Sequence, residues 1–172
     1  MQKSSVHNGN EMYGLYTYSG KFSRRDKPEG YELHKNVKIS SDLFGLRMFI
    51  YWNIISLGKA RAYIMTDTNG EIAHYSFVMP KCYKFPFMRS PRSGDIVIGP
   101  CVTTEKDRGR GLYPYVLSRI IESHTNGGTI YMIVRDDNTS SIRGITKVGF
   151  EKKATIEKDN RKKIYRSIIL DG

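Results

Sequence analysis

Residues 95–122 read DIVIGPCVTTEKDRGRGLYPYVLSRIIE, and this stretch decides how the rest of the chain is interpreted. It begins with a strand at residues 95–98, bounded by Gly99-Pro100, and residues 101–103 continue in extended form. A basic loop with two glycines, residues 108–111, then opens into a helix whose apolar residues recur at helical spacing. The first N–H groups of such a helix lack internal partners, and the helix dipole is positive there. The stretch therefore predicts a pyrophosphate site at the start of this helix.

Other phosphate-binding motifs do not fit this loop. It lacks the Gly-x-x-x-x-Gly-Lys-Ser/Thr pattern of P-loops and the Gly-x-Gly-x-x-Gly spacing of dinucleotide-binding folds. Gly109 and Gly111 let the backbone bend and approach a phosphate closely, and Arg108 and Arg110 add positive charge. The remaining alternative is a plain surface loop with flexible glycines and solvated arginines.

The loop RGRGL at residues 108–112 resembles the Arg/Gln-x-x-Gly-x-Gly/Ala loop of the GNAT superfamily of acyl-CoA N-acyltransferases. Tyr113 stands at the position that the family usually gives to glycine or alanine. Pro114 follows it, which the first turn of a helix tolerates, although proline removes one N–H donor.

A second match lies downstream at a fitting distance. Residues 131–134 (YMIV) indicate a buried strand, and DDNTSS at 136–141, a helix and KVGF at 147–150 follow. This order resembles the family's strand, Asn-x-x-Ser motif, helix and Gly-Phe segment, and it implies that Asn138 and Ser141 lie near the CoA chain. The resemblance is clearest over residues 95–157, and the first forty residues contribute nothing to it.

The resemblance implies acetyl-CoA as the acyl donor. In the family, the fourth strand bulges away from the fifth and the pantetheine arm enters the wedge between them; Gly99-Pro100 sits where such a bulge is expected. A backbone N–H after the bulge, within residues 101–103, would polarise the thioester carbonyl. The residues implied in cofactor binding are Val102, Thr103, Arg108, Gly109, Arg110, Gly111, Leu112, Tyr113, Asn138 and Ser141.

The general acid is not evident from the sequence. The family often has a tyrosine four residues before the glycine of Gly-Phe, where this chain has Ile145. Tyr113 and Tyr115 are nearby alternatives, and a thiol of pKa about 8–9 can also leave unassisted.

His74 is the first candidate for a general base, because it lies on a predicted central strand and histidine titrates near neutral pH. Glu105 and Asp95 are the next candidates for this role. Cys101 is a candidate nucleophile for a two-step route. The alternatives are a polar histidine satisfied within the sheet and a small buried thiol, since no His or Asn partner for Cys101 is identifiable.

The composition indicates one domain, residues 1–172, with 39% apolar residues to build a core. Cys82 and Cys101 lack metal-ligand spacing, so neither a disulfide framework nor a metal site is expected. No apolar run of about 18 residues and no signal-peptide core occurs, so we expect no membrane partner and a cytoplasmic location. The net charge of +11 is spread along the chain and leaves three kinds of partner open: nucleic acid, a membrane surface or an anionic small molecule. Of these we expect an anionic small molecule rather than nucleic acid.

The remaining segments complete a mixed sheet. Residues 1–30 are expected to be an irregular arm, part of which pairs at most as an edge strand, with about the first ten residues poorly ordered. Ser40-Ser41-Asp42 caps a helix that Gly58 ends, and Asn69-Gly70 is a hairpin turn. The apolar stripe of that helix is Leu43, Leu46, Ile50, Ile54 and Leu57. The predicted strands are 31–39, 60–67, 71–79, 95–98, 129–134, 150–157 and 163–170.

The sequence thus predicts an α/β (α+β), GNAT-like fold, with about seven strands, helices on both faces and a splayed central strand pair. The predicted function is transfer of an acetyl or other short acyl group from acyl-CoA to an amine. The Gly-Pro-Cys and Leu-Tyr-Pro segments resemble family members associated with bacterial surface-polysaccharide pathways, which suggests a nucleotide-linked amino sugar as acceptor. Two alternatives are acylation of a protein or peptide amine, with residues 80–93 as a groove, and a basic nucleic-acid-binding module. The sequence does not indicate an oligomeric state.

Overall fold

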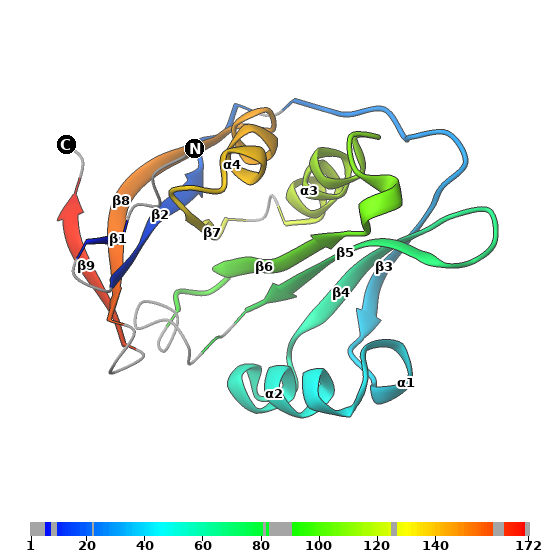
Figure 1. Cartoon of the computed structure of the whole chain (residues 1–172), viewed down its shortest axis with the longest axis horizontal. Coiled ribbons are helices and arrows are strands. Elements are labelled where there is room, and N and C mark those ends of the chain that lie inside the picture. Colours follow the sequence, from blue (N-terminus) through cyan, green and yellow to red (C-terminus); the bar gives the residue numbers. More distant parts are fainter. Residues whose placement is uncertain are drawn as a thin grey trace.

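The computed structural model describes residues 6–7, 10–21, 23–80, 82, 91–124, 127–159 and 164–170 (Figure 1). One mixed sheet runs through the molecule and helices cover both of its faces, which confirms the predicted fold class. Most of the predicted aromatic loop at 80–93, the turn at 160–163 and the first five residues lie outside the described residues.

The sheet contains nine strands, in the order β3-β4-β5-β6-β7-β2-β8-β9, with β1 pairing only with β2. β6 and β7 are parallel, and every other pair of neighbours is antiparallel. The seven predicted strands are all present. The strands are β1 (Val6–His7), β2 (Asn10–Tyr18), β3 (Glu32–Lys38), β4 (Arg61–Thr66), β5 (Ile72–Met79), β6 (Ile96–Thr103), β7 (Ile130–Arg135), β8 (Phe150–Asp159) and β9 (Ile164–Leu170).

The prediction of an irregular N-terminal arm, paired at most as an edge strand, is wrong for β2. This strand lies inside the sheet, where it pairs with β7 on one side and with β8 on the other. Tyr16 is buried, and its ring lies over Gly14, whose added Cβ would be 2.5 Å from the ring. Tyrosines bury a large apolar body behind a polar tip, so a tyrosine-rich strand looks polar in sequence although it can occupy an interior position.

β6 and β7 part after three residues of pairing. Ile96 to Ile98 pair with Ile130 to Met132; beyond Ile98, β6 continues beside β5 and β7 continues beside β2. Pro100 has no N–H to offer to a ladder, so pairing with β7 does not resume there. The predicted splayed strand pair is confirmed, and we call the region between the parted strands the wedge.

The starts of β6 and β7 are tied together at the closed end of the wedge. The buried Asp95 carboxylate accepts the N–H of Thr129 at 2.8 Å and the N–H of Arg92 at 2.9 Å. A Cβ added to Gly128 would lie only 1.8 Å from the carbonyl carbon of Gly94, so the two backbones touch there. The Asp95 carboxylate therefore binds backbone N–H groups at this junction. This structural role argues against Asp95 as the general base that the sequence suggested.

Two pairs of helices cover the sheet (Figure 1). α3 (Leu112–Ser123) and α4 (Thr139–Thr146) pack on one face, and α1 (Ser41–Phe44) and α2 (Leu46–Ser56) pack on the other. A short 3-10 helix, η2 (Glu105–Asp107), leads from β6 toward α3. The core is therefore split into two clusters, one on each side of the sheet.

The helix predicted between Ser40 and Gly58 is present but broken at Gly45, where φ is 77°. An apolar stripe normally faces the core, but the predicted stripe faces outward here, and Trp52 and Ser56 are the buried residues of α2. α2 is apolar on nearly every side, so its periodicity does not reveal which side meets the sheet.

Candidate active site

The loop between β6 and α3 places two glycines and two arginines at the start of a helix. We call residues 108–113 the anion loop. Gly109 and Gly111 have φ values of 78° and 77°, and a Cβ at either position would meet no atom within 4 Å. The first hydrogen bond of the helix runs from the N–H of Tyr115 to the Gly111 carbonyl at 3.1 Å. The N–H groups of residues 112 and 113 precede this bond, so they have no partner within the helix, and none among the other described residues. The loop therefore has room, donors and charge for an anion.

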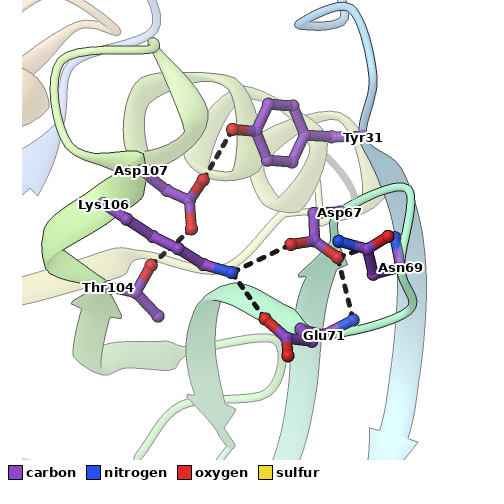
Figure 2. A network of polar contacts seen from close by, with 7 residues as sticks. All are labelled: Tyr31, Asp67, Asn69, Glu71, Thr104, Lys106 and Asp107. Atoms are coloured by element: carbon purple, nitrogen blue, oxygen red, sulfur yellow. Dashed lines mark hydrogen bonds and ion pairs between the residues drawn. The ribbon is translucent and has the colours of Figure 1, made fainter.

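A buried carboxylate holds the entry to the anion loop in place (Figure 2). Asp107 accepts a hydrogen bond from the Thr104 hydroxyl at 2.5 Å and one from the Tyr31 hydroxyl at 2.7 Å. The Thr104 bond and then the Tyr31 bond hold the pKa of Asp107 below its usual value. Arg110 lies close enough to Asp107 and Tyr31 to affect the pKa of both. Asp107 thus links the loop to Tyr31, just before β3, and to Thr104, just after β6.

The neighbouring Lys106 turns toward the β4–β5 hairpin instead (Figure 2). Its ammonium group forms ion pairs with Asp67 at 3.1 Å and with Glu71 at 2.5 Å. Asp67 also accepts the N–H groups of Asn69 and Glu71, which shapes the predicted Asn69-Gly70 turn. Lys106 and Glu71 are mostly exposed, so the ion pair between them adds little stability, whereas Asp67 is largely buried in the hairpin turn.

Polar side chains from β5 and β6 meet at the wedge. His74 is opposite Thr103 and Ser76 is opposite Cys101 in the antiparallel register. The His74 Nδ1 atom lies 2.7 Å from the Thr103 hydroxyl, and Nε2 lies 2.8 Å from the Ser76 hydroxyl. Both ring nitrogens of this buried histidine are therefore satisfied within the sheet.

Tyr113 lies between β5 and α4 and contacts both. Its ring lies 5.8 Å from the His74 ring on one side, and its hydroxyl lies 3.1 Å from the Ser141 hydroxyl on α4. The hydroxyl and the Cys101 thiol are close enough to affect the pKa of each other. A Cβ on Gly144 would be 2.7 Å from the Tyr113 ring, so α4 approaches the ring closely only because this residue is glycine. Burial raises the pKa of Tyr113 well above its usual value.

The environment of His74 argues against the general-base role predicted from the sequence. Burial lowers its pKa to about 3, so the imidazole is neutral and a weak base at physiological pH. Both nitrogens are already hydrogen-bonded, and the alternative of a satisfied sheet histidine describes the observed geometry.

The buried His74 is expected to make the protein sensitive to mild acid. Its pKa is lower in the folded state than in the unfolded state, so the unfolded state binds the extra proton, and stability falls as pH drops below about 6.5. Denaturant unfolding from pH 7 to pH 5 should show a slope approaching about 1.4 kcal/mol per pH unit from this group. His74→Gln should be less stable at pH 7 but should lose that slope. An unchanged slope in the variant would place the titration elsewhere.

The structure places the two other catalytic candidates from the sequence in different environments. Burial raises the pKa of the Cys101 thiol to about 12, so it stays protonated and is a poor nucleophile. Glu105 is exposed on η2, and its carboxylate has no hydrogen bond or ion pair with a described residue. Among the described residues, Glu105 has no hydrogen bond to His74, whose ring nitrogens meet Thr103 and Ser76 instead.

The strand pairing narrows the backbone donors that face the wedge. Thr104 donates its N–H to Ala73 on β5 at 2.9 Å. Backbone groups alternate sides along a strand, so Val102 also directs its N–H toward β5, whereas Cys101 and Thr103 direct theirs away from β5. The N–H of Val102, implied by the family resemblance as a ligand, is thus engaged in the sheet. The wedge receives the N–H groups of Cys101 and Thr103.

Comparison with solved structures identifies this arrangement. A tandem GNAT protein from the clavulanic acid biosynthesis pathway matches with a TM-score of 0.60 at 17% identity, over 83% of this chain and 50% of that chain. This is the GNAT fold. A GNAT-family acetyltransferase from Colwellia psychrerythraea matches with a TM-score of 0.57 at 13% identity, over 84% of this chain and 53% of that one.

The GNAT fold is also seen in a phosphinothricin acetyltransferase from Sinorhizobium meliloti, whose structure contains acetyl-CoA. It matches with a TM-score of 0.52 at 16% identity, over 71% of this chain and 75% of that one. The chain spans about half the length of the first two structures. No family model matches the sequence, and no curated protein is similar to it. At these identities the likeness establishes the fold.

Within this GNAT fold, the Asn-x-x-Ser segment begins α4. The Asn138 side chain accepts the N–H of Ser141 at 3.0 Å and so acts as the N-cap of the helix. This bond does not use the Asn138 amide nitrogen, which can still donate to a ligand. The Ser141 hydroxyl contacts Tyr113 and has room in its hydrogen bonding for a further partner. Ile145, at the family's usual tyrosine position, is fully buried.

Sequence reasoning missed two parts of this site. Ser76 completes the hydrogen bonding of His74, and its place two residues further along the same strand is the signal that could have found it. Asp107 and Tyr31 come from segments far apart in sequence, so no local pattern joins them. In the described residues, no cluster of side chains is suited to a metal ion, and no helix is long and apolar enough to cross a bilayer.

Proposed function

We propose that the chain moves an acetyl or other short acyl group from acyl-CoA to an amine by direct transfer. The observation that carries this proposal is the parting of β6 and β7 beyond Ile98, directly beside the anion loop. The loop would hold the diphosphate through backbone N–H groups and through Arg108 and Arg110. The open space over Gly109 and Gly111 fits a phosphate that approaches the backbone closely.

The residues of this chain would promote the reaction mainly by positioning and by hydrogen bonding. The acceptor nitrogen attacks the thioester carbonyl, the carbon–sulfur bond breaks, and its electrons pass to sulfur. The N–H groups of Cys101 and Thr103 are the donors that would stabilise the charge on the carbonyl oxygen. The Tyr113 hydroxyl would donate a proton to the departing sulfur, and the proton that the amine loses restores it. Because the Cys101 thiol stays protonated, a covalent route through it is disfavoured.

We infer that the acceptor is a small anionic amine, such as a nucleotide-linked amino sugar. The net charge of +11 supports an anionic partner, because a positive surface attracts and steers such molecules. We place the reaction in the cytoplasm, because a chain with only two cysteines, which lack metal-ligand spacing, suits a reducing compartment.

Binding of CoA is the first test of this function. Acetyl-CoA at about 100 times its Kd should stabilise the protein by about 2.7 kcal/mol, seen as a rise in Tm. Arg108→Glu combined with Arg110→Glu should remove most of the shift, because both changes put negative charge beside a diphosphate. Arg92→Glu is a control for reversing the charge of one exposed arginine, to be compared with Arg108→Glu alone, since Arg92 is also exposed but lies at the closed end of the wedge.

The same melting assay separates the proposal from its rivals. A shift with oligonucleotide at low salt, without any shift with acetyl-CoA, would support a nucleic-acid-binding module instead. Free-thiol release with a panel of amino sugars, peptides and small amines then identifies the acceptor. Transfer to peptides alone would replace the small-molecule proposal.

Tyr113→Phe should lower kcat by about tenfold to a hundredfold while the Kd for CoA changes less than about twofold. The change removes the hydroxyl that faces Ser141 and Cys101 but keeps the ring. The raised pKa keeps Tyr113 protonated, so the variant should lose rate at every pH from 6 to 9 without altering the shape of the pH–rate profile.

Tyr115→Phe is the control for this prediction, because Tyr115 is buried on the same helix but its ring contacts Arg119 rather than the wedge. An unchanged kcat in Tyr113→Phe would show that the thiolate leaves unassisted. A Tyr113→Ala variant that binds CoA far more tightly than the wild type would show that the ring occupies the donor's place.

A further inference from the structure

The outer face of α1 and α2 is apolar, and no other described residue buries it. Of the seven large hydrophobic side chains that the described residues expose, six lie between Leu43 and Leu57. Scattered exposed hydrophobic residues are normal, but a contiguous group marks a contact surface. The exposed fractions are 45% for Leu43, 63% for Leu46, 45% for Ile50, 45% for Tyr51, 67% for Ile54 and 55% for Leu57.

This face is additional to the one that anchors the helix. Trp52 is buried and packs with Phe77 at a ring distance of 5.7 Å, and Ser56 is buried beside it. Phe44 packs edge-on against Phe77 from α1. The inner side of the helices therefore fixes them on the sheet, whereas Leu46 and Ile54 in the outer stripe keep most of their surface exposed.

The surroundings of the stripe are basic. Residues 33–61 contain five Lys or Arg side chains and a single acidic one, Asp42. Arg61 donates to the Gly58 carbonyl at the end of α2 and is opposite Lys38 in the sheet, so positive charge collects at this end of the stripe. The basic side chains are Lys35, Lys38, Arg47, Lys59 and Arg61.

We propose that α1 and α2 dock the protein onto an anionic membrane surface. The helices would lie in the plane of the membrane, with the leucine and isoleucine side chains among the acyl chains and the lysines and arginines at the headgroups. The sequence-based expectation of no membrane contact rested on the lack of a spanning run, which a helix lying on a membrane does not need. A second copy of the chain fits less well, because the basic rims of two chains of net charge +11 would face one another.

Docking in this way leaves the anion loop accessible. α1 and α2 cover the sheet face opposite to α3, whose N-terminus carries the loop (Figure 1). The proposal does not depend on acyl transfer, since it concerns a different face of the molecule, and either proposal can fail while the other holds.

Co-sedimentation with vesicles tests the proposal. The protein should bind vesicles of phosphatidylcholine mixed with phosphatidylglycerol, bind pure phosphatidylcholine weakly, and dissociate at high salt. Leu46→Ser combined with Ile54→Ser should weaken binding to the mixed vesicles at least about tenfold at unchanged Tm, because both side chains are already exposed. Lys38→Gln combined with Lys59→Gln should weaken it roughly tenfold.

The control for charge is Lys21→Gln combined with Lys153→Gln, which removes as many exposed cations from the other end of the sheet and should change binding less than about twofold. No binding to the mixed vesicles, or equal loss in the control, would overturn the proposal. So would a dimer in sedimentation velocity that the Leu46 and Ile54 substitutions split, because the stripe would then be a contact between two copies. A Leu46 and Ile54 variant that fails to fold would also contradict it, since the stripe would then be covered in the isolated protein.

Discussion

Gly111→Asp is expected to bind CoA about a hundredfold or more weakly than the wild type. Gly111 is the N-cap of α3 with φ of 77°, and its missing Cβ opens onto space where no protein atom lies within 4 Å. An aspartate there would put a carboxylate against the bound diphosphate, and two like charges about 4 Å apart repel by about 4 kcal/mol at an effective dielectric constant near 20. Isothermal titration with CoA measures the effect.

Gly111→Asn is the matched control, because asparagine has the same shape and tolerates the left-handed backbone about as well. It should weaken CoA binding less than about tenfold, since it adds no charge, and both variants should melt within a few degrees of the wild type. Equal affinities of the two variants would show that charge at this position is irrelevant and would remove the anion loop as the diphosphate site. Full affinity in both would have the same consequence.

Gly128→Ala is expected to destabilise the fold by roughly 4 kcal/mol or more, enough to unfold a marginally stable domain. The new methyl group would lie 1.8 Å from the Gly94 carbonyl carbon and 1.9 Å from its oxygen, and both are backbone atoms that cannot turn aside. The strands β6 and β7 would have to separate at their start, where Asp95 accepts the N–H of Thr129. Urea unfolding followed by circular dichroism measures the loss.

The neighbouring glycine provides the control for this prediction. Gly127 has a φ of 106°, but a Cβ there would meet nothing within 4 Å. Gly127→Ala should therefore cost only the backbone strain, about 1–2 kcal/mol. If Gly128→Ala were no worse than Gly127→Ala, the two strands would not be in the tight contact described here, and the closed end of the wedge would be loose.

Most of the fold could be predicted because its signals are local. The Asn69-Gly70 turn lies between two alternating strands, and the strand–helix–strand order after Asp95 fixes a parallel pair. The place of β2 and the exposed side of α2 could not be predicted in the same way. Both depend on which distant segment packs against the element. The sequence of a tyrosine-rich strand, or of a helix that is apolar on all sides, does not indicate which segment that is.

In the candidate site, too, features with a local sequence signal could be predicted, and features that depend on distant segments could not. The anion loop could be predicted from the sequence, because glycines and arginines at the start of a helix both favour binding of an anion. The role of His74 was not readable, because its pKa depends on burial and on Ser76 and Thr103, which only the register of β5 and β6 brings to it. The sequence shows that Tyr113 departs from the family loop, but its contact with Ser141 depends on the position of α4.

The inner position of β2 has a consequence for biosynthesis. Apart from the short β1 beside its first residues, its partners are residues 131–135 and 150–158, so over a hundred further residues of chain must leave the ribosome before the rest of β2 can be paired. Contacts this distant in sequence slow folding and leave β-edges open to aggregation meanwhile. A truncated protein that begins after Tyr18 would lack β2. In such a protein β7 and β8 would have no strand between them.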